Sequence, residues 1–361
     1  MLLVLLIAAV IWGAGLATGA PPRLRWSGIA ILWLAVVLGH LVLPDGNGLR
    51  AATGGRAAPW LLLGGAAVIV AGYRAGLRVL RNRAQPVVAD PIQQGPFREA
   101  ELRRYARHIV LREVGGPGQV RLKQARVLVI GAGGLGSPAL MYLAAAGVGA
   151  IGVVDDDAVD GSNLQRQVIH SDQDIGRAKV HSAAERMRAI NPFIEVRPYQ
   201  QRLGAAEAVD LFGQYDLILD GTDNFDTRFL VNRAAVQAGK PLISGALTQW
   251  EGQISVFDPA QNAPCYECVF PTAPAPGLAP PCAEAGVIGP LPGVVGSIMA
   301  VEAVKVITGA GTPLLGEMLI YDALWGETRK IGLKRRFDCP VCGAGNVQNS
   351  VDRVAADAAK A

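Results

Sequence analysis

An apolar run of residues leads directly into a glycine-rich turn at 126–136, which reads RVLVIGAGGLG. A short apolar run that ends at glycine predicts a buried strand, and the apolar segment after the turn predicts a helix over 137–147. The glycines would let the backbone approach a phosphate closely, and the helix start would offer it free N–H groups. They are Gly131, Gly133, Gly134 and Gly136. This strand–turn–helix unit predicts a nucleotide site.

Strands and helices continue to alternate along the chain. Further strands are predicted at 150–154, 215–220, 241–244, 252–257 and 318–322. Further helices are predicted at 99–113, 176–190, 226–239 and 294–308. Strands that alternate with helices form a mostly parallel sheet covered by helices. We therefore expect an α/β fold, a Rossmann-like doubly wound and mostly parallel sheet with a β extension at its C-terminal end.

The N-terminal part of the chain is apolar to an extent that globular domains are not. Three stretches lack any charged residue: 1–22, 26–44 and 57–73. A membrane-spanning helix needs about 20 apolar residues, and the first two stretches reach that length. The third extends to about residue 80 only past Arg74 and Arg78, whose long side chains can reach the headgroups. We therefore predict about three transmembrane helices within residues 1–80.

The flanking charges predict the orientation of these spans. Arg74, Arg78, Arg81 and Arg83 follow the third apolar stretch. Positive charge favours the cytoplasmic side, so we expect a multi-pass protein of the inner (cytoplasmic) membrane whose remaining part faces the cytoplasm. A cleaved signal peptide over residues 1–20 is the alternative, but no Lys or Arg precedes Arg23 to form its basic start.

Composition sets the remaining boundaries. Residues 81–98 contain three prolines and no sustained period, which predicts a linker. A globular domain is expected over 99–345, followed by a flexible tail at 346–361. Within the domain, 271–292 holds seven prolines and predicts a mobile loop. The net charge of +4 is too small to indicate a nucleic-acid-binding protein.

A carboxylate follows the second predicted strand. Asp155 lies 19 residues beyond Gly136, where a carboxylate grips a ribose hydroxyl in dinucleotide-binding folds. The glycine turn and Asp155 alone would favour an NAD-dependent oxidoreductase. That class is one of the functions that the sequence leaves open.

A second polar set favours a nucleoside triphosphate over NAD. Arg166 and Lys179 supply positive charge suited to a triphosphate with a good leaving group. Asp223 and its neighbour Asn224 follow another strand, where a carboxylate could hold Mg²⁺. Asn163 belongs to the same polar run as Arg166. The sequence therefore predicts an ATP site with magnesium.

Four of the five cysteines form two Cys-x-x-Cys pairs. These are Cys265, Cys268, Cys339 and Cys342. Four thiolates at this spacing fit a closed, structural zinc site, although a redox-active pair has the same local pattern. The zinc would staple the C-terminal β extension to the domain. The fifth cysteine, Cys282, lies in the proline-rich loop.

Residues 99–345 resemble the MoeB/ThiF/HesA family, the bacterial relatives of ubiquitin-activating enzymes. The matching stretches are RYARHI (104–109), VLVIGAGGLGSPA (127–139), NLQRQVIHSD (163–172), GRAKV (176–180), LILDGTDN (217–224), EGQISVF (251–257), PCYEC (264–268), EAGVIGPLPGVVGS (284–297) and CPVCG (339–343). The stretches are distributed over nearly the whole expected domain, in order and at the family's spacing. The resemblance implies ATP-dependent adenylylation of the C-terminal Gly-Gly carboxylate of a small ubiquitin-like sulfur-carrier protein.

The resemblance also implies roles for single residues. Gly133 and its neighbours would contact the α-phosphate region, and Asp155 would bind ribose. Asn163 and Arg166 would contact phosphates. Lys179 would neutralise the α-phosphate. The remaining implied roles are Mg²⁺ binding by Asp223 and an Arg107 that reaches the ATP site of a partner subunit, since the family enzymes are homodimers.

The partners follow from the resemblance as well. We expect a MoaD-like carrier, for molybdopterin synthesis, with a ThiS-like carrier, for thiamin synthesis, as the alternative; the family motifs do not separate the two. Sulfur would come from another protein, a cysteine desulfurase or a rhodanese. In some family members a cysteine near the position of Cys282 forms a thioester or persulfide with the carrier, and in others it is dispensable; both roles stay open for Cys282.

Overall fold

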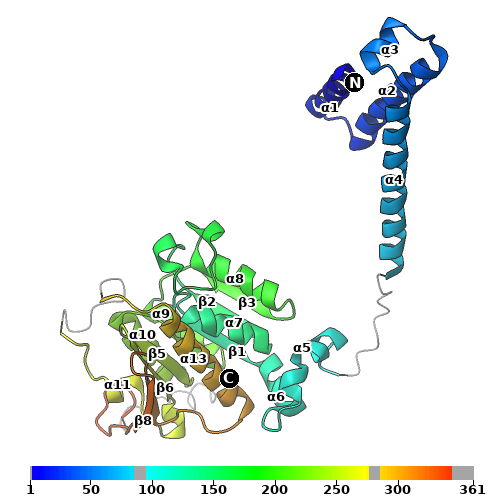
Figure 1. The fold of residues 1–361 in the computed structure, drawn as a ribbon. Coiled ribbons are helices and arrows are strands. Elements are labelled where there is room, and N and C mark those ends of the chain that lie inside the picture. The colour runs from blue at the N-terminus through cyan, green and yellow to red at the C-terminus, as the bar shows by residue number, and fades with distance from the viewer. Residues whose placement is uncertain (1, 85–94, 276–284, 344–361) are drawn as a thin grey trace, which may run out of the picture. The chain divides into compact units, whose positions relative to one another are not determined.

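The computed structural model describes residues 2–84, 95–275 and 285–343 (Figure 1). The chain divides into two compact units, Met1–Ile92 and Gln93–Ala361. Most of the predicted linker, the predicted tail at 346–361 and Cys282 lie outside the described residues. The start of the predicted linker, residues 81–84, continues a helix, so the linker prediction began too early.

The described residues of the first unit form four helices. They are α1 (Leu2–Ala17), α2 (Pro22–Val42), α3 (Gly48–Thr53) and α4 (Ala58–Ala84). Pro22 is the first residue of α2, a position whose N–H would have no partner within the helix, so proline costs no hydrogen bond there. Helix α3 begins where the Asn47 side chain accepts a hydrogen bond from Leu49 N, and it ends at Gly54, whose φ of 117° suits glycine.

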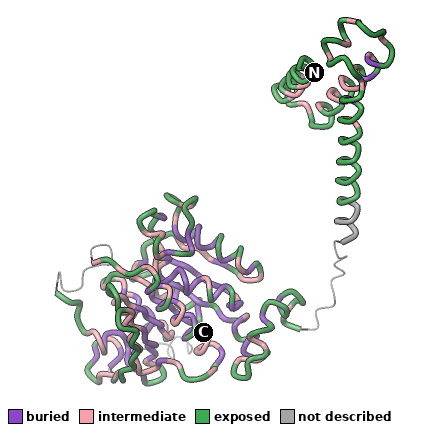
Figure 2. The backbone as a smooth tube through the Cα atoms, in the orientation of Figure 1, coloured by how far each residue is buried: buried purple, intermediate pink, exposed green. Residues whose placement is uncertain are grey.

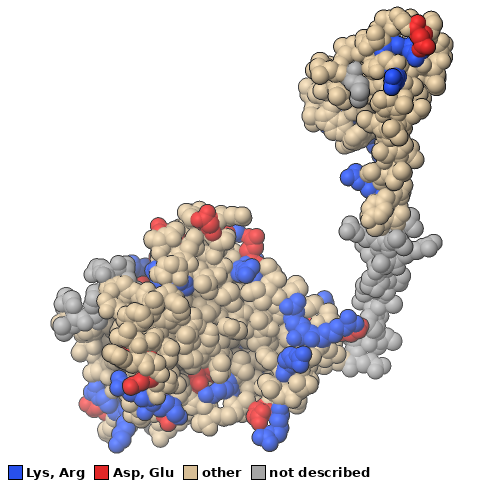
Figure 3. Space-filling view, viewed as in Figure 1, with Lys and Arg blue, Asp and Glu red and all other residues tan. Residues whose placement is uncertain are grey.

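Two helices of this unit are long and apolar enough to cross a membrane, Pro22–Val42 and Ala58–Leu77. In the view of Figure 3, most of this unit's surface carries neither basic nor acidic side chains. Helix α1 has only 16 residues, roughly 24 Å at the usual rise, against about 30 Å of hydrocarbon. The predicted first span therefore forms a shorter helix than expected, because Gly19 (φ 68°) and the two prolines after it end the helical backbone.

Two tryptophans, Trp33 and Trp60, connect segments of this unit. Trp60 is buried, and its Nε1 donates to Thr53 O (3.0 Å), while Trp33 Nε1 donates to Trp60 O (2.8 Å). Gly64 lies so close to the Trp33 ring that an added Cβ would meet it at 2.2 Å. Both indole N–H groups thus find partners inside the unit, as the N–H groups of buried indoles usually do.

The second unit is built on one eight-stranded sheet of order β3-β2-β1-β4-β5-β6-β7-β8. The strands are β1 (Arg126–Ile130), β2 (Ala150–Val154), β3 (Glu195–Tyr199), β4 (Leu217–Asp220), β5 (Leu242–Leu247), β6 (Glu251–Phe257), β7 (Glu317–Asp322) and β8 (Glu327–Gly332). The pairs from β3 to β5 are parallel, and those from β5 to β8 are antiparallel. The predicted parallel-dominated sheet and its β extension are confirmed.

Two strands were not predicted, and each has a physical reason. Strand β3 contains Pro198 and is only partly buried, and β8, ETRKIG, is exposed along its whole length. Both lie at the edges of the sheet, where polar residues replace the apolar run that marks a buried strand.

Helices cover both faces of the sheet, which makes the fold doubly wound (Figures 1 and 2). They are α5 (Glu99–Ile109), α6 (Gly115–Gln124), α7 (Gly136–Ala146), α8 (Lys179–Ile190), α9 (Ala205–Gly213), α10 (Phe225–Gln237), α11 (Tyr266–Val269) and α13 (Pro290–Thr308). Helices α7, α8 and α13 pack on one face, and α9 and α10 pack on the other. Helix α13 starts four residues earlier than predicted, because Pro290 and Pro292 fit the first turn of a helix.

The strand order places a ligand site. Strand β1 pairs with β2 on one side and with β4 on the other. The chain goes from β1 to β2 and β3 on one side and then crosses to β4 on the other side, so the strand order reverses at β1. Ligands of such sheets bind outside the carboxyl ends of the strands at this switch point. The glycine turn follows β1 at that end of the sheet.

Candidate active site and metal centre

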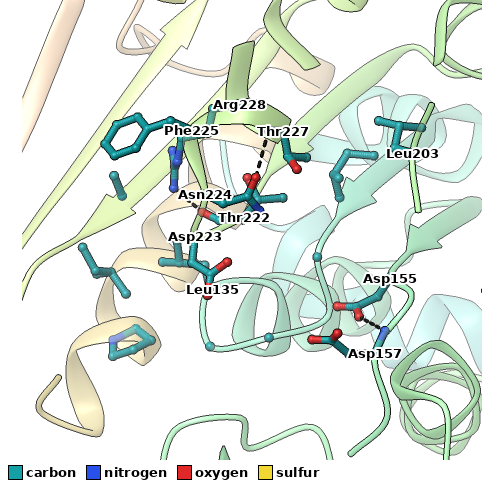
Figure 4. Close-up of a pocket in the computed structure, with 18 of the residues that line it drawn as sticks. Leu135, Asp155, Asp157, Leu203, Thr222, Asp223, Asn224, Phe225, Thr227 and Arg228 are labelled. Atoms are coloured by element: carbon teal, nitrogen blue, oxygen red, sulfur yellow. Dashed lines mark hydrogen bonds between the residues drawn. The ribbon is translucent and has the colours of Figure 1, made fainter. Parts of the chain in front are cut away.

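A cavity of about 670 Å³ opens at the carboxyl ends of β1, β2 and β4 (Figure 4). Its wall contains most of the residues that the sequence singled out for a nucleotide. These are Gly131, Gly133, Gly134, Asp155, Arg166, Lys179, Asp223 and Asn224. Three segments far apart in sequence thus meet at one site, as the predicted parallel sheet requires.

The glycine turn is shaped by close contacts of the backbone. Gly131 has φ 94°, and a Cβ on Gly136 would lie 1.9 Å from Gly131 O. Gly136 therefore makes the turn possible rather than lining the cavity. No side chain caps the start of α7, but Ser137 N already donates to Gly133 O (2.9 Å) and Pro138 has no N–H, so an anion at this turn would be received mainly by the backbone N–H groups of the glycines.

Two buried polar atoms at the turn have no hydrogen-bond partner among the described residues. They are Gln167 Oε1 and Ser137 Oγ, and Gln167 also lines the cavity. Buried polar groups in native proteins are nearly always paired. An amide oxygen accepts hydrogen bonds, so a donor of a nucleotide, such as a ribose hydroxyl or the adenine amino group, would be the partner that Gln167 Oε1 lacks, whereas a phosphate oxygen would not.

Asp155 is fastened to the turn. Its two carboxylate oxygens accept hydrogen bonds from Ala132 N (2.8 Å) and Asp157 N (2.9 Å). Burial raises the pKa of the Asp155 carboxyl above its ordinary value, and the nearby Lys179 partly opposes this. Each oxygen keeps a lone pair for a hydroxyl, which is compatible with the predicted contact to ribose.

The two predicted cations, Lys179 and Arg166, each bond to an oxygen of a nearby side chain. Lys179, the first residue of α8, is buried, and its Nζ lies 2.6 Å from Asp157 Oδ2. Arg166 Nη2 donates to Asn163 Oδ1 (2.6 Å). Asn163 is not among the residues that line the cavity, and its observed contact is with Arg166. Direct contact of Asn163 with a phosphate stays a prediction.

Asp223 points into the cavity from a fixed turn (Figure 4). Its side chain is exposed and makes no hydrogen bond or ion pair within the described residues. The next residue, Asn224, caps α10 by accepting from Thr227 N (2.9 Å). A free carboxylate on a fixed turn is a suitable ligand for a hard cation such as Mg²⁺.

Sequence reasoning missed a buried polar group behind this turn. Asp220, Arg228 and Ser244 are each at most 6% exposed and bond to one another. The acidic residue that ends the apolar run LILD was a usable signal, because a carboxylate in a buried strand needs partners. Its partners on α10 and β5 could not be read from the sequence.

Arg107 lies on α5, outside the cavity. Its side chain is exposed and makes no hydrogen bond or ion pair within the residues that the structure describes. This arrangement leaves the residue available to a second subunit, and its role there stays a prediction.

The four paired cysteines converge on one buried point. Cys265 Sγ lies 3.9 Å from Cys268 Sγ and 3.6 Å from Cys339 Sγ, and Cys268 Sγ lies 3.4 Å from Cys342 Sγ. All four sulfur atoms lie within 4.8 Å of one another. Zinc with bonds of about 2.3 Å to four sulfurs requires sulfur–sulfur separations of about 3.8 Å in a tetrahedron. The donor set therefore fits a structural zinc, and it joins α11 to the segment after β8.

The thiols of the cluster differ in pKa in the absence of a bound cation. Burial raises the pKa of the Cys268 thiol to about 11, whereas a hydrogen bond from Cys265 lowers the pKa of Cys342 to about 5. A divalent cation would hold all four as thiolates, because thiolates are the form that binds metal.

The second unit is similar to known proteins. The model of the ThiF family matches residues 105–341. A sulfur carrier protein adenylyltransferase of Thermus thermophilus is 52% identical over 247 residues, which are 67% of this chain and 91% of that protein. A SAMP-activating enzyme E1 of Haloferax volcanii is 47% identical over 252 residues, 70% of this chain and 93% of that protein.

Other matches are less complete. A probable adenylyltransferase/sulfurtransferase MoeZ of Mycobacterium tuberculosis is 55% identical over 245 residues, 66% of this chain, but this chain spans only 62% of MoeZ. The crystal structure of E. coli MccB with MccA-N7isoASN has a TM-score of 0.57 at 24% identity and covers 63% of this chain and 69% of that one. That likeness shows the fold alone. The family match and the identity to nearly full-length relatives together confirm the resemblance of the motifs: this chain belongs to the ThiF family.

Proposed function

We propose that this chain is an ATP-dependent adenylyltransferase that activates the C-terminal Gly-Gly carboxylate of a small ubiquitin-like sulfur-carrier protein. The observation that carries the proposal is a single cavity lined by a glycine turn, two cations (Arg166 and Lys179) and a carboxylate (Asp223) that has no partner within the described residues. The relatives' names, which include sulfur carrier protein adenylyltransferase, support the same activity. An NAD-dependent oxidoreductase would need one pyrophosphate cradle and no such set of charges.

The reaction follows from the charges in the cavity. An oxygen of the carrier's carboxylate forms a bond to the α-phosphorus of ATP, the bond from that phosphorus to the leaving oxygen breaks, and pyrophosphate departs. Both reactants are anions, so the site must mainly position them and neutralise charge. Lys179 and Arg166 supply the neutralisation. No general base is needed, because a carboxylate is already ionised at pH 7.

A magnesium ion would be held by Asp223, with Asn224 beside it. The ion would supply further positive charge to the phosphates. The four cysteines would hold a zinc ion that is structural, because four protein ligands leave no open position for a substrate. The glycine turn and the start of α7 would receive phosphate, and Asp155 would receive the ribose hydroxyls.

The carrier's identity can be tested directly by ATP–pyrophosphate exchange. The purified chain is mixed with labelled pyrophosphate and ATP, and MoaD-like and ThiS-like carriers are added in separate reactions. Exchange that depends on the MoaD-like carrier is the expected result and places the enzyme in molybdopterin synthesis. Exchange only with the ThiS-like carrier would assign it to thiamin synthesis. Zinc-loaded, folded protein that exchanges with neither would contradict the proposal.

The assembly around the enzyme is part of the proposal. A homodimer would bring Arg107 of each subunit to the ATP site of the other, consistent with its side chain, which is exposed and has no partner within the described part of the chain. A cysteine desulfurase or a rhodanese would then deliver sulfur to the adenylylated carrier. Cys282 would either take part in that transfer as a thioester or persulfide or stay outside the chemistry.

The first unit would anchor the enzyme in the cytoplasmic membrane with the second unit in the cytoplasm. We expect the full chain to stay in the membrane pellet after a carbonate wash, and the 86–361 fragment to leave it. The reason is that α2 and α4 expose long apolar faces, which water would disfavour. A full chain released by the wash, or a fragment that stays with the membrane, would contradict the anchor.

A further inference from the structure

A buried ion pair lies directly behind the turn that carries Asp223. Arg228 Nη1 is 3.4 Å from Asp220 Oδ2, and both side chains are almost completely buried. A buried ion pair is costly, since each charge gives up its hydration, and apolar replacements are often as stable. A contribution to stability is therefore a weak explanation for the presence of this ion pair. Arg228 also lines the cavity.

The guanidinium of Arg228 is fully occupied at its two terminal nitrogens. Nη1 donates to Asp220 Oδ2 and to Ser244 Oγ (3.2 Å), and Nη2 donates to Gly245 O (2.8 Å) and to Thr222 O. Arg228 thus bonds to protein atoms on β4, β5 and the turn between β4 and α10, and its planar fork has no pair of donors left for a phosphate.

Asp220 completes the connection from the other side. Its Oδ1 accepts from Thr222 N (3.0 Å) and Thr222 Oγ1 (2.6 Å), while its Oδ2 also accepts from Ser244 Oγ (3.0 Å). Thr222 is therefore held through its N–H, its hydroxyl and its carbonyl. Asn224, on the other side of Asp223, is held by its bond to Thr227 N. Asp223 is the free residue between two fixed ones (Figure 4).

We propose that Arg228 is a positioning residue for adenylylation, which with Asp220 and Ser244 fixes the 221–224 turn so that the Asp223 carboxylate meets the cation of the metal–nucleotide. This inference rests on the proposed function. The clamp, meaning Asp220, Arg228 and Ser244, touches no substrate. It acts by removing freedom from the one carboxylate that does, because a misplacement of about 1 Å can cost about 100-fold in rate.

The test is Arg228→Lys, which keeps the positive charge but cannot reach four acceptors with one ammonium. The full chain in detergent micelles is assayed for carrier-dependent ATP–pyrophosphate exchange over a range of Mg²⁺ concentrations. We expect the maximal rate to fall about 10- to 100-fold. The Mg²⁺ concentration at half-maximal rate should rise at least about threefold, while the KM for the carrier stays within about twofold.

Arg233→Lys is the matched control. Arg233 lies on the same helix and pairs with Glu267 (2.8 Å), but it does not line the cavity. It should leave the rate and the Mg²⁺ dependence within about twofold of the wild type. A folded, zinc-loaded Arg228→Lys variant with wild-type Mg²⁺ dependence would overturn the proposal, even if its thermal stability were lower.

Two milder variants decide the matter if Arg228→Lys does not fold. Ser244→Ala removes one link of the clamp, and Thr222→Val removes the hydroxyl that donates to Asp220. Each should raise the Mg²⁺ requirement in the same direction, by about two- to fivefold, and unchanged values for both would overturn the clamp. A wild-type chain without exchange contradicts the proposed function instead, and the Mg²⁺ dependence of ATP binding by calorimetry then tests the clamp in the same variants.

Discussion

Replacing Lys179 by alanine is expected to lower the rate of carrier-dependent ATP–pyrophosphate exchange by at least about 100-fold. Removing one preorganised charge-stabilising group from an active site typically costs about 10²–10³ in kcat. Lys179 is buried in the wall of the cavity, and the ammonium is fixed by Asp157 at 2.6 Å. Its charge therefore acts in a partly desolvated site, where it is worth more than in water.

Separate effects on kcat and on the KM for ATP make this prediction specific. Lys179 should act mainly on the transition state, so kcat should fall much more than the KM for ATP rises. Lys330→Ala is the matched control, because Lys330 also pairs with a carboxylate, Glu317 at 2.7 Å, but on the surface of the extension. A Lys179→Ala variant with more than about a tenth of wild-type kcat would show that charge at this position does not drive the reaction.

Replacing Cys339 and Cys342 together by serine is expected to abolish zinc binding and to lower the melting temperature by at least about 10 °C. Structural zinc contributes about 10–16 kcal/mol to the folding of zinc-finger peptides. We expect part of that free energy to stabilise the folded second unit. In a domain of this size, each 1 kcal/mol corresponds to about 2–4 °C. The metal also closes a loop of 70 residues between Cys268 and Cys339, which raises the cost of losing it.

The measurements are zinc content per chain by mass spectrometry of the metal and thermal unfolding with and without chelator. Wild-type protein should carry about one zinc per chain, and Cys282→Ser should carry the same amount, because four other cysteines already complete the tetrahedron. Zinc retained in the double-serine variant, or a melting temperature unaffected by its loss, would refute a structural metal at this cluster.

Local patterns were enough to predict the sheet and most of the site. The apolar runs indicated β1, β2 and β4, because buried strands must be apolar on both faces. The glycine turn was predictable because only glycine fits where backbones meet at the distance seen between Gly136 and Gly131. Parallel strands bring their carboxyl ends to one edge, so the order of strands in the sequence was enough to assign Asp155 and Asp223 to one site.

The extent of the N-terminal spans was only partly predictable. Charge-free stretches indicated three apolar segments, and α2 and α4 reach membrane length. Helix α1 does not, because the length of a helix depends on where the backbone turns as well as on where charges lie. The turn at Gly19 and the prolines after it end α1 at Ala17.

The tertiary structure alone decided which residue each polar group contacts. The sequence by itself determined the order of the apolar, buried strands, the glycine turn, the two cations and the four thiols, because a local pattern marks each of them. It did not determine that Arg228 of α10 bonds to Ser244 of β5, or that the exposed segment β8 pairs with β7. The physical reason is that buried polar groups must find partners across the fold, and those partners depend on sheet register and helix packing rather than on neighbours in the chain.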